Sequence, residues 1–270
     1  MPLPVRTKWG MALVQQPLFC QYLGLFSREE VSESQVEFFL RSLGRHFPYI
    51  SVYDFHPCHT VALRRLLPTC PDFEVLEKTT HWLNLEKSYV DLASEYTVDR
   101  TKNLKKSRKY LWEWVESDDI EPLIQLFKEN HAIQIQGIHE SAYVLLRTLI
   151  QLLQEKKVAL IRYTYRHGKI HAGIMILENK GMGIYIFNAA DAVGRKGNAR
   201  TFLLDRYFQE KAGRIEAFDF ESPEVPSIAQ FYQSFGASQQ TFISLKKNKL
   251  PFPFRQLQNI RKLLFRTFRH

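Results

Sequence analysis

The pattern of apolar and polar residues predicts an orderly succession of helices and strands in the second half of the chain. Apolar residues recur at helical spacing in residues 119–130 and 139–155. The period then changes to that of strands in three segments rich in β-branched and aromatic residues, 158–165, 169–178 and 182–189. Two short runs typical of hairpin turns separate these segments, His167-Gly168 and Asn179-Lys180-Gly181. We therefore predict two helices followed by an antiparallel meander.

A second succession of elements follows the meander. The pattern predicts a helix at 199–211, a strand at 214–220, a helix at 225–235 and a strand at 240–246. The strand at 214–220 should run parallel to the strand at 182–189, because a helix connects the two.

The first half of the chain has a less regular pattern. It predicts strands at 9–14, 49–55, 72–79 and 110–115, and helices at 32–43, 59–67 and 87–108, the last broken near Thr97. Polar residues at 116–118 separate two apolar stretches and suggest a boundary. We therefore expect an N-terminal half at 1–116, a C-terminal half at 117–250, and an amphipathic helical tail at 251–270.

Composition narrows the class of protein. The chain has 270 residues, of which 45% are hydrophobic, enough for one large domain or two packed halves. With 12 glycines and 3 cysteines it is neither collagen-like nor a disulfide scaffold. The odd number of cysteines favours a reducing, cytoplasmic location. Residues 9–27 are uncharged, but the glutamines and the proline among them argue against a membrane span.

Positive charge is concentrated in two segments. Residues 100–109 and 241–270 together have a net charge of +14, whereas the rest of the chain has −5. Such segments suit an anionic partner, either tRNA or an anionic membrane surface, through residues 100–109 and 246–269. Binding to a membrane would place the protein at the inner face of the membrane. The alternative is that both segments are solvated surface.

A glycine-containing turn precedes the predicted helix at 199–211. Its sequence is Gly194-Arg195-Lys196-Gly197-Asn198-Ala199, and Arg200 follows. The N-terminus of a helix offers free N–H groups, and glycine lets a backbone approach a phosphate closely. The alternative is an ordinary turn before a helix.

The order of elements from 119 to 246, together with this turn, resembles the GCN5-related N-acetyltransferase (GNAT) fold. The resemblance implies an α+β fold of mixed central sheets flanked by helices. In that family the turn wraps the pyrophosphate of coenzyme A, so acyl-CoA would be the donor. The implied donor-binding residues are Gly194, Arg195, Lys196, Gly197, Asn198 and Arg200. The family's first position in the turn, Gln or Arg, is Gly194 here.

A second motif supports the same resemblance. Residues 231–237 (FYQSFGA) are similar to a GNAT segment in which a tyrosine protonates the departing thiolate, and Tyr232 occupies that position. A tyrosine is protonated at neutral pH and can donate its proton. The alternative is a half-buried tyrosine that packs on the sheet.

The FemAB-like branch, which pairs two GNAT-like halves, resembles this chain more closely. Residues 218–237 are similar to its "FDFGG…P…FK…FGA" segment, and the basic stretch at 101–109 is similar to its N-terminal region. The resemblance implies two GNAT-like halves and transfer of amino acids or acyl groups to amines. Glu221-Ser222 replaces the family's Gly-Gly, so substrate contacts do not carry over there.

Acyl transfer to an amine needs a base for the amine and donors for the oxyanion. In a GNAT-like site, backbone N–H groups near 187–190 would stabilise the oxyanion. Asp191, Asp219 and Glu221 are candidate bases, and each could instead be a structural cap or a surface acid. His56, Cys58 and His59 lie close in sequence but have no second motif, so we expect no metal.

Two functions remain open. In the first, the protein is an acyl- or aminoacyltransferase that moves an acyl group from acyl-CoA or aminoacyl-tRNA to an amine acceptor. In the second, it is a catalytically silent GNAT-like protein that binds an anionic surface through its basic segments.

Overall fold

The computed structural model describes residues 1–8, 10–131, 139–258 and 260, and the chain forms two compact units. Unit 1 consists of Met1–Lys78 and Thr241–His270, and unit 2 consists of Thr79–Gln240. This division differs from the boundary expected near residue 116. The physical reason is that the last strand returns to the first unit, a pairing that no local pattern reveals.

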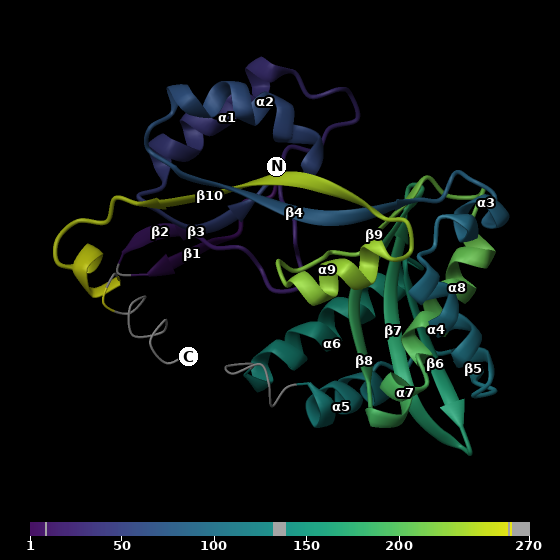
Figure 1. Cartoon of the computed structure of the whole chain (residues 1–270). Coiled ribbons are helices and arrows are strands. Elements are labelled where there is room, and N and C mark those ends of the chain that lie inside the picture. Colours follow the sequence, from purple (N-terminus) through teal and green to yellow (C-terminus); the bar gives the residue numbers. More distant parts are fainter. Residues whose placement is uncertain (9, 132–138, 259, 261–270) are drawn as a thin grey trace. The chain divides into compact units, whose positions relative to one another are not determined.

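Unit 1 is a mixed sheet covered by two helices. Its strands lie in the order β1 (Val5–Lys8), β2 (Met11–Val14), β3 (Tyr49–Asp54) and β10 (Ser238–Asn248). The pair β1–β2 is antiparallel, β2–β3 parallel and β3–β10 antiparallel. The helices α1 (Glu33–His46) and α2 (Thr60–Leu66) lie together beside these strands (Figure 1), with 3₁₀ turns at Pro57–His59 and Leu67–Thr69.

Local sequence explains why α1 begins where it does. Ser32 and Gln35 form a capping box, each side chain bonding the other's backbone N–H. Val36, Leu40 and Leu43 then recur at helical spacing and are buried in the core of unit 1. The helix predicted at 32–43 is confirmed.

Unit 2 contains the remaining elements, apart from Glu74–Lys78 at the start of its first strand, which belong to unit 1. Its strands lie in the order β4 (Glu74–Asn84), β9 (Ala217–Asp219), β8 (Met182–Ala190), β7 (Lys169–Asn179), β6 (Ala159–Arg166) and β5 (Glu113–Glu116). The helices are α3 (Tyr89–Ser94), α4 (Val98–Arg108), α5 (Glu121–Asn130), α6 (Glu140–Glu155), α7 (Ala192–Lys196), α8 (Ala199–Lys211) and α9 (Pro226–Gln233).

The predicted meander is confirmed. Strands β6, β7 and β8 pair antiparallel. Both connecting turns have positive φ at two successive residues, 51° and 73° at His167 and Gly168, and 47° and 76° at Lys180 and Gly181. Such turns match the twist of the strands they join, which is why their sequences predicted hairpins.

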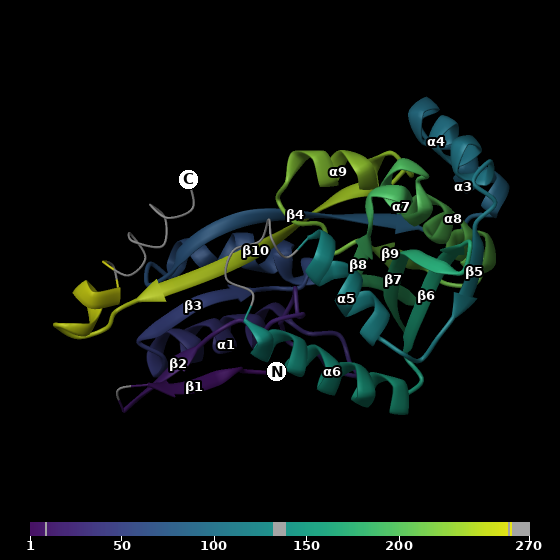
Figure 2. The same cartoon turned by 90° about the horizontal axis from the view of Figure 1, so that it is seen from below.

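Helices cover both faces of the meander. Figure 2 shows α5 and α6 on one face and α4 and α8 on the other. On the α5 face, a Cβ at Gly173 would lie 2.8 Å from both the Leu123 side chain of α5 and the Tyr163 ring of β6, so the glycine leaves room for both. On the α8 face, Ile174 and Ile176 join Leu203 in the core of unit 2.

Strands β8 and β9 part from each other, and this feature positions the candidate site. They run parallel, as predicted, but their pairing ends at Ile184 with Asp219. The pairing of β8 with β7 continues to Ala190. The stretch of β8 after Ile184 is therefore paired in the sheet on its β7 side only.

Several elements differ in detail from the prediction. The helix expected at 87–108 is two helices, α3 and α4, and Thr97 caps the second. Strand β1 was not predicted, and α7 occupies the expected turn. Of the predicted tail helix, residues 259 and 261–270 lie outside the described residues. Among the described helices, none is both long and apolar enough to span a bilayer.

Candidate functional site

The N-terminus of α8 presents unused hydrogen-bond donors. Its N-cap, Asn198, is left-handed with φ 54° and makes no side-chain cap. Within the described part of the chain, the N–H groups of Ala199, Arg200 and Thr201 have no acceptor. Ala199 is 0% exposed and Thr201 is 2% exposed. Buried donors of this kind at a helix start attract an anion.

Two arginines add positive charge to these donors. Arg100 of α4 is only 5% exposed, and its guanidinium donates to the hydroxyls of Thr201 at 2.6 Å and Ser234 at 2.8 Å. Arg200 donates to Asn188 Oδ1 at 2.7 Å. Neither arginine forms an ion pair with a carboxylate of the described residues. We call these two guanidinium groups and the three N–H groups the α8 site.

The electrostatics of Arg100 reflect its surroundings. The guanidinium stacks 4.1 Å from the ring centre of Phe231 and 4.3 Å from that of Phe235. Burial, together with the charge of Arg200, lowers the pKa of Arg100 to about 10. It is still protonated at neutral pH, so the site remains positively charged.

The turn expected to wrap a pyrophosphate is largely closed. Gly194 N–H donates to Asp191 Oδ1 at 2.7 Å, and Arg195 N–H donates to Asp191 O at 2.9 Å. Gly197 and Asn198 N–H also bond within the turn, at 2.8 and 3.2 Å. Of the N–H groups expected to face a phosphate, those at the start of α8 are the ones without a partner.

The two glycines of this turn are explained by packing. A Cβ at Gly194 would lie 2.1 Å from the carbonyl oxygen of His171, and one at Gly197 would lie 2.3 Å from the Trp112 ring. The charged residues of the turn point elsewhere: Arg195 donates to Ala190 O at 2.7 Å, and Lys196 is exposed. These glycines therefore let α7 approach β7 and Trp112.

Tyr232 of α9 lies near the α8 site. It is 6% exposed and stacks on Phe220, with ring centres 4.3 Å apart. Burial raises its pKa to about 12, while the charge of Arg200 opposes that shift. The phenol is therefore protonated at neutral pH. Its hydroxyl has no hydrogen-bond partner in the described part of the chain.

A second tyrosine accompanies it. Tyr185 of β8 meets Tyr232 edge to face at 6.2 Å and is 3% exposed. Its hydroxyl is buried and has no hydrogen-bond partner among the described residues. Burial raises its pKa, and Arg200 is near enough to lower it. An unsatisfied buried hydroxyl beside a cation is a second indication of a ligand here.

Two of the candidate carboxylates lie near the end of β9. Asp219 is 3% exposed, and its Oδ1 accepts from Thr80 Oγ1 at 3.0 Å and from Glu221 N–H at 2.8 Å. Thr80 Oγ1 in turn accepts from Ser222 N–H at 3.1 Å. Asp219 thus orders the segment that replaces the family's Gly-Gly. Glu221 has φ 43°, and its charge is near enough to raise the pKa of Tyr232.

The third carboxylate, Asp191, lies at the end of β8. Its Oδ1 accepts from Gly194 N–H, and its Oδ2 bonds His171 Nδ1 at 2.8 Å.

One of the backbone N–H groups expected to stabilise an oxyanion lies next to Asp191 in the chain: Ala190 N–H donates to His131 Nε2 at 3.2 Å. Burial and the charges of Arg200 and Arg195 lower the pKa of His131. The Ala190 N–H is thus one of the expected oxyanion donors, and it already has a partner.

The structure therefore brings some predicted site residues together. The charges of Arg200 and Glu221 both act on the pKa of Tyr232, while Asp191 is occupied by His171 and the cap of α7. Sequence reasoning missed Tyr185 as a site residue and treated Arg100 only as part of a basic run. No local signal distinguishes Arg100 from the lysines beside it.

In the described ranges, no three His, Cys, Asp or Glu side chains are placed to hold a metal ion.

Comparison with known proteins rests on structure alone. No family model and no curated protein matches the chain. The structure of FemX is similar with a TM-score of 0.63 at 12% identity, over 94% of this chain and 85% of FemX. The chain has a double GNAT-like fold close to that of FemAB-like proteins.

Two further structures have similar folds. L-PGS from Bacillus licheniformis matches with a TM-score of 0.55 at 10% identity, over 95% of this chain and 84% of that protein. The C-terminal domain of a protein from Agrobacterium fabrum assigned as a lysylphosphatidylglycerol synthetase matches with 0.52 at 9% identity, over 86% and 78%. At these identities the similarity concerns the fold.

Proposed function

We propose that the protein is a transferase that moves an acyl or aminoacyl group from an activated donor to an amine acceptor. The observation that supports this most is the α8 site: buried, unused N–H groups and two arginines without carboxylate partners, next to Tyr232. Such a site suits the phosphate of a donor. The name of the Agrobacterium protein, a lysylphosphatidylglycerol synthetase, supports aminoacyl transfer as one form of the reaction.

The residues of unit 2 then have distinct roles. The α8 site holds the anionic part of the donor, and the stretch of β8 after Ile184 lies along the reacting acyl group. The acceptor nitrogen attacks the donor carbonyl, the bond to the leaving oxygen or sulfur breaks, and Tyr232 gives that atom its proton. Glu221 is the favoured base for the acceptor ammonium, because its charge acts on Tyr232, the proposed proton donor.

We propose aminoacyl-tRNA rather than acyl-CoA as the donor. The N–H groups of Gly194, Arg195, Gly197 and Asn198 are engaged within the turn and are not available to a CoA pyrophosphate. The α4 helix and its C-cap residue also present exposed lysines at helical spacing, Lys102, Lys105, Lys106 and Lys109. Exposed lysines at this spacing suit an RNA backbone.

The second basic segment is less suited to such a partner. Lys246 lies 4.0 Å from Glu74, and Lys247 lies 3.5 Å from Asp72, which also pairs with Lys249. These carboxylates neutralise part of the charge predicted for residues 246–269. We therefore propose α4 as the RNA-binding surface and the cytoplasm, where tRNA is present, as the location.

Donor binding by the full chain tests the proposal. A donor at 100 times its dissociation constant stabilises the fold by about 2.7 kcal/mol, which a melting curve detects. Arg200→Ala should weaken binding of the favoured donor at least tenfold, whereas Arg214→Ala, at an exposed position of unit 2, should not. Stabilisation by acyl-CoA but not by aminoacyl-tRNA would reverse the choice of donor.

The alternative is a catalytically silent protein that binds RNA or an anionic membrane. It predicts binding without product formation, and vesicle binding that depends on anionic lipid. Comparing full-length protein with a 1–250 truncation on tRNA and on anionic vesicles, across a salt series, separates the two surfaces.

A further inference from the structure

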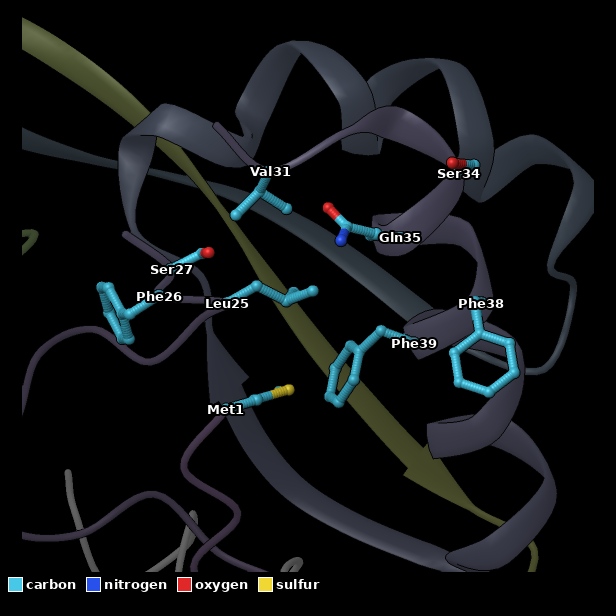
Figure 3. Close-up of a pocket in the computed structure, with 9 residues that line it drawn as sticks. All are labelled: Met1, Leu25, Phe26, Ser27, Val31, Ser34, Gln35, Phe38 and Phe39. Carbon is cyan, nitrogen blue, oxygen red and sulfur yellow. The ribbon is translucent and has the colours of Figure 1, made fainter. Parts of the chain in front are cut away.

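Unit 1 contains an apolar pocket that the proposed transfer reaction does not use. It has a volume of about 380 Å³ and lies between the loop before α1 and α1 itself (Figure 3). Its apolar lining comes from the start of the chain, this loop and α1: Met1, Leu25, Phe26, Val31, Phe38 and Phe39. Phe26 and Phe38 lie at opposite sides of the group in Figure 3.

The pocket combines a fixed floor with an exposed rim. Phe39 is partly buried and packs against the core, with its ring centre 6.4 Å from that of Tyr53 and 6.5 Å from that of Phe55. Phe26 and Phe38 are 58% and 74% exposed. Both phenylalanines line the pocket and leave apolar surface in water, although the Phe26 ring also meets His56 edge to face at 6.3 Å. Covering that surface is favourable.

The side-chain oxygens of the lining already have hydrogen-bond partners. Gln35 Oε1 accepts from Ser32 N–H at 2.9 Å, Ser34 Oγ bonds Ser32 Oγ at 2.9 Å, and Ser27 Oγ accepts from Glu29 N–H at 3.2 Å. The lining residues include no Asp, Glu, Lys, Arg or His. The polar groups that remain are the α-amino group of Met1 and Nε2 of Gln35, and the other lining side chains favour an apolar ligand.

The volume of the pocket favours an alkyl chain over a single aromatic ring as its ligand. A cavity of about 150 Å³ already holds benzene. One aromatic side chain from a protein partner would therefore leave more than half of this pocket unfilled. A flexible alkyl chain can fill an irregular space lined by methionine and phenylalanine.

We propose that this pocket binds the alkyl chain of a single-chain amphiphile, with the head group left in solvent at the rim. The inference does not rest on the proposed transferase activity, because binding at the pocket needs no donor and no transfer. The occupant is a lipid-like chain, and a peptide anchor is the competing outcome of the test.

The test is calorimetry of the full chain with n-alkyl glucosides from hexyl to decyl, each below its micelle concentration. Each added methylene should tighten binding about fourfold until the pocket is full. Affinity that does not change with chain length, or no binding, would overturn the proposal. Indole that binds more tightly than octyl glucoside would also overturn it, in favour of an aromatic anchor.

Matched variants locate the binding. Phe38→Asp places a carboxylate at the rim and should weaken octyl glucoside at least tenfold. Val61→Asp makes a similar change on α2, at a residue that is 61% exposed and outside the pocket, and should have no effect. Phe26→Asp repeats the test from the loop if Phe38→Asp lowers the melting temperature. Equal weakening by Val61→Asp would place the binding elsewhere.

Because Tyr232→Phe lies in unit 2, it should leave octyl glucoside binding unchanged. Loss of transfer with intact binding, or the reverse, therefore separates failure of the proposed function from failure of this inference.

Discussion

Single residues of this protein show how one feature can suit two interpretations. Gly194 and Gly197 fit a phosphate turn in the sequence, yet each is required by close packing against His171 O and the Trp112 ring. Spacing alone cannot separate these reasons, because a phosphate and a neighbouring side chain both demand a missing Cβ. The donors that remain free lie just beyond the glycines, at the start of α8.

Gly194→Ala should destabilise unit 2. Its Cβ would meet the backbone oxygen of His171 at 2.1 Å, and backbone cannot move aside cheaply. We expect a loss of about 1–3 kcal/mol in the free energy of unfolding, measured in urea. Gly44→Ala in α1 is the control, since its Cβ would make only an ordinary 3.4 Å contact with the Phe73 ring and the change should stabilise the helix. A neutral Gly194→Ala would contradict the packing explanation.

Tyr232→Phe tests the proposed proton donor. The substitution keeps the ring that stacks on Phe220 and removes only the hydroxyl. We expect turnover to fall roughly 10- to 10⁴-fold with little change in donor affinity. Steady-state kinetics and donor titration measure both quantities. Turnover equal to that of the parent would assign Tyr232 to packing.

At the scale of elements, local signals predicted most of the fold. The meander was predictable because its signals are local in the sequence: side chains repeat with the period of two of a strand, and turn residues stand between the strands. The break at Thr97 was predictable for the same reason, since a threonine caps α4. The helix α7 was not, because five residues form it only where Asp191 and a close approach to β7 hold them.

The same contrast applies to the candidate site. Tyr232 and the start of α8 follow from sequence motifs, whereas the burial of Arg100 results from packing among α4, α8 and α9. Arg100 belongs to a run of six basic residues, and the run by itself predicts solvent exposure for all of them. Only tertiary structure shows that one member is buried.

Arg100→Met should loosen the contact of α9 with α8. The change removes the bonds to Ser234 and Thr201 and the stacking on Phe231. Since hydrogen bonds to charged groups contribute about 1.5–3 kcal/mol each, we expect at least about 2 kcal/mol lower stability. Lys105→Met, at an exposed position of the same helix, should stay within about 0.5 kcal/mol. Equal effects of the two variants in urea unfolding would show that Arg100 does not join these helices.

At the scale of the whole molecule, the two units differ in how the chain builds them. Unit 2 is one continuous segment, Thr79–Gln240, whereas unit 1 needs both ends of the chain. β10 pairs with β3, and Ile243 and Leu245 lie in the core of unit 1 with Leu40 and Leu63. The boundary expected near residue 116 followed the order of elements along the chain, and order cannot reveal a strand that returns across about 190 residues.

This architecture predicts that the two units behave differently as fragments. A fragment of residues 79–240 keeps the strand pairs of β4 with β9 and β8 with β9, and the complete core of unit 2. It should fold cooperatively, as seen in circular dichroism and a sharp melting transition. A fragment of residues 1–78 lacks β10, so the edge of β3 and the buried faces of α1 and α2 lose their partners. We expect it to remain unfolded, and we expect a synthetic peptide of residues 238–250 added in excess to restore its structure. A folded 1–78 fragment, or one that the peptide does not change, would mean that β10 contributes little to unit 1.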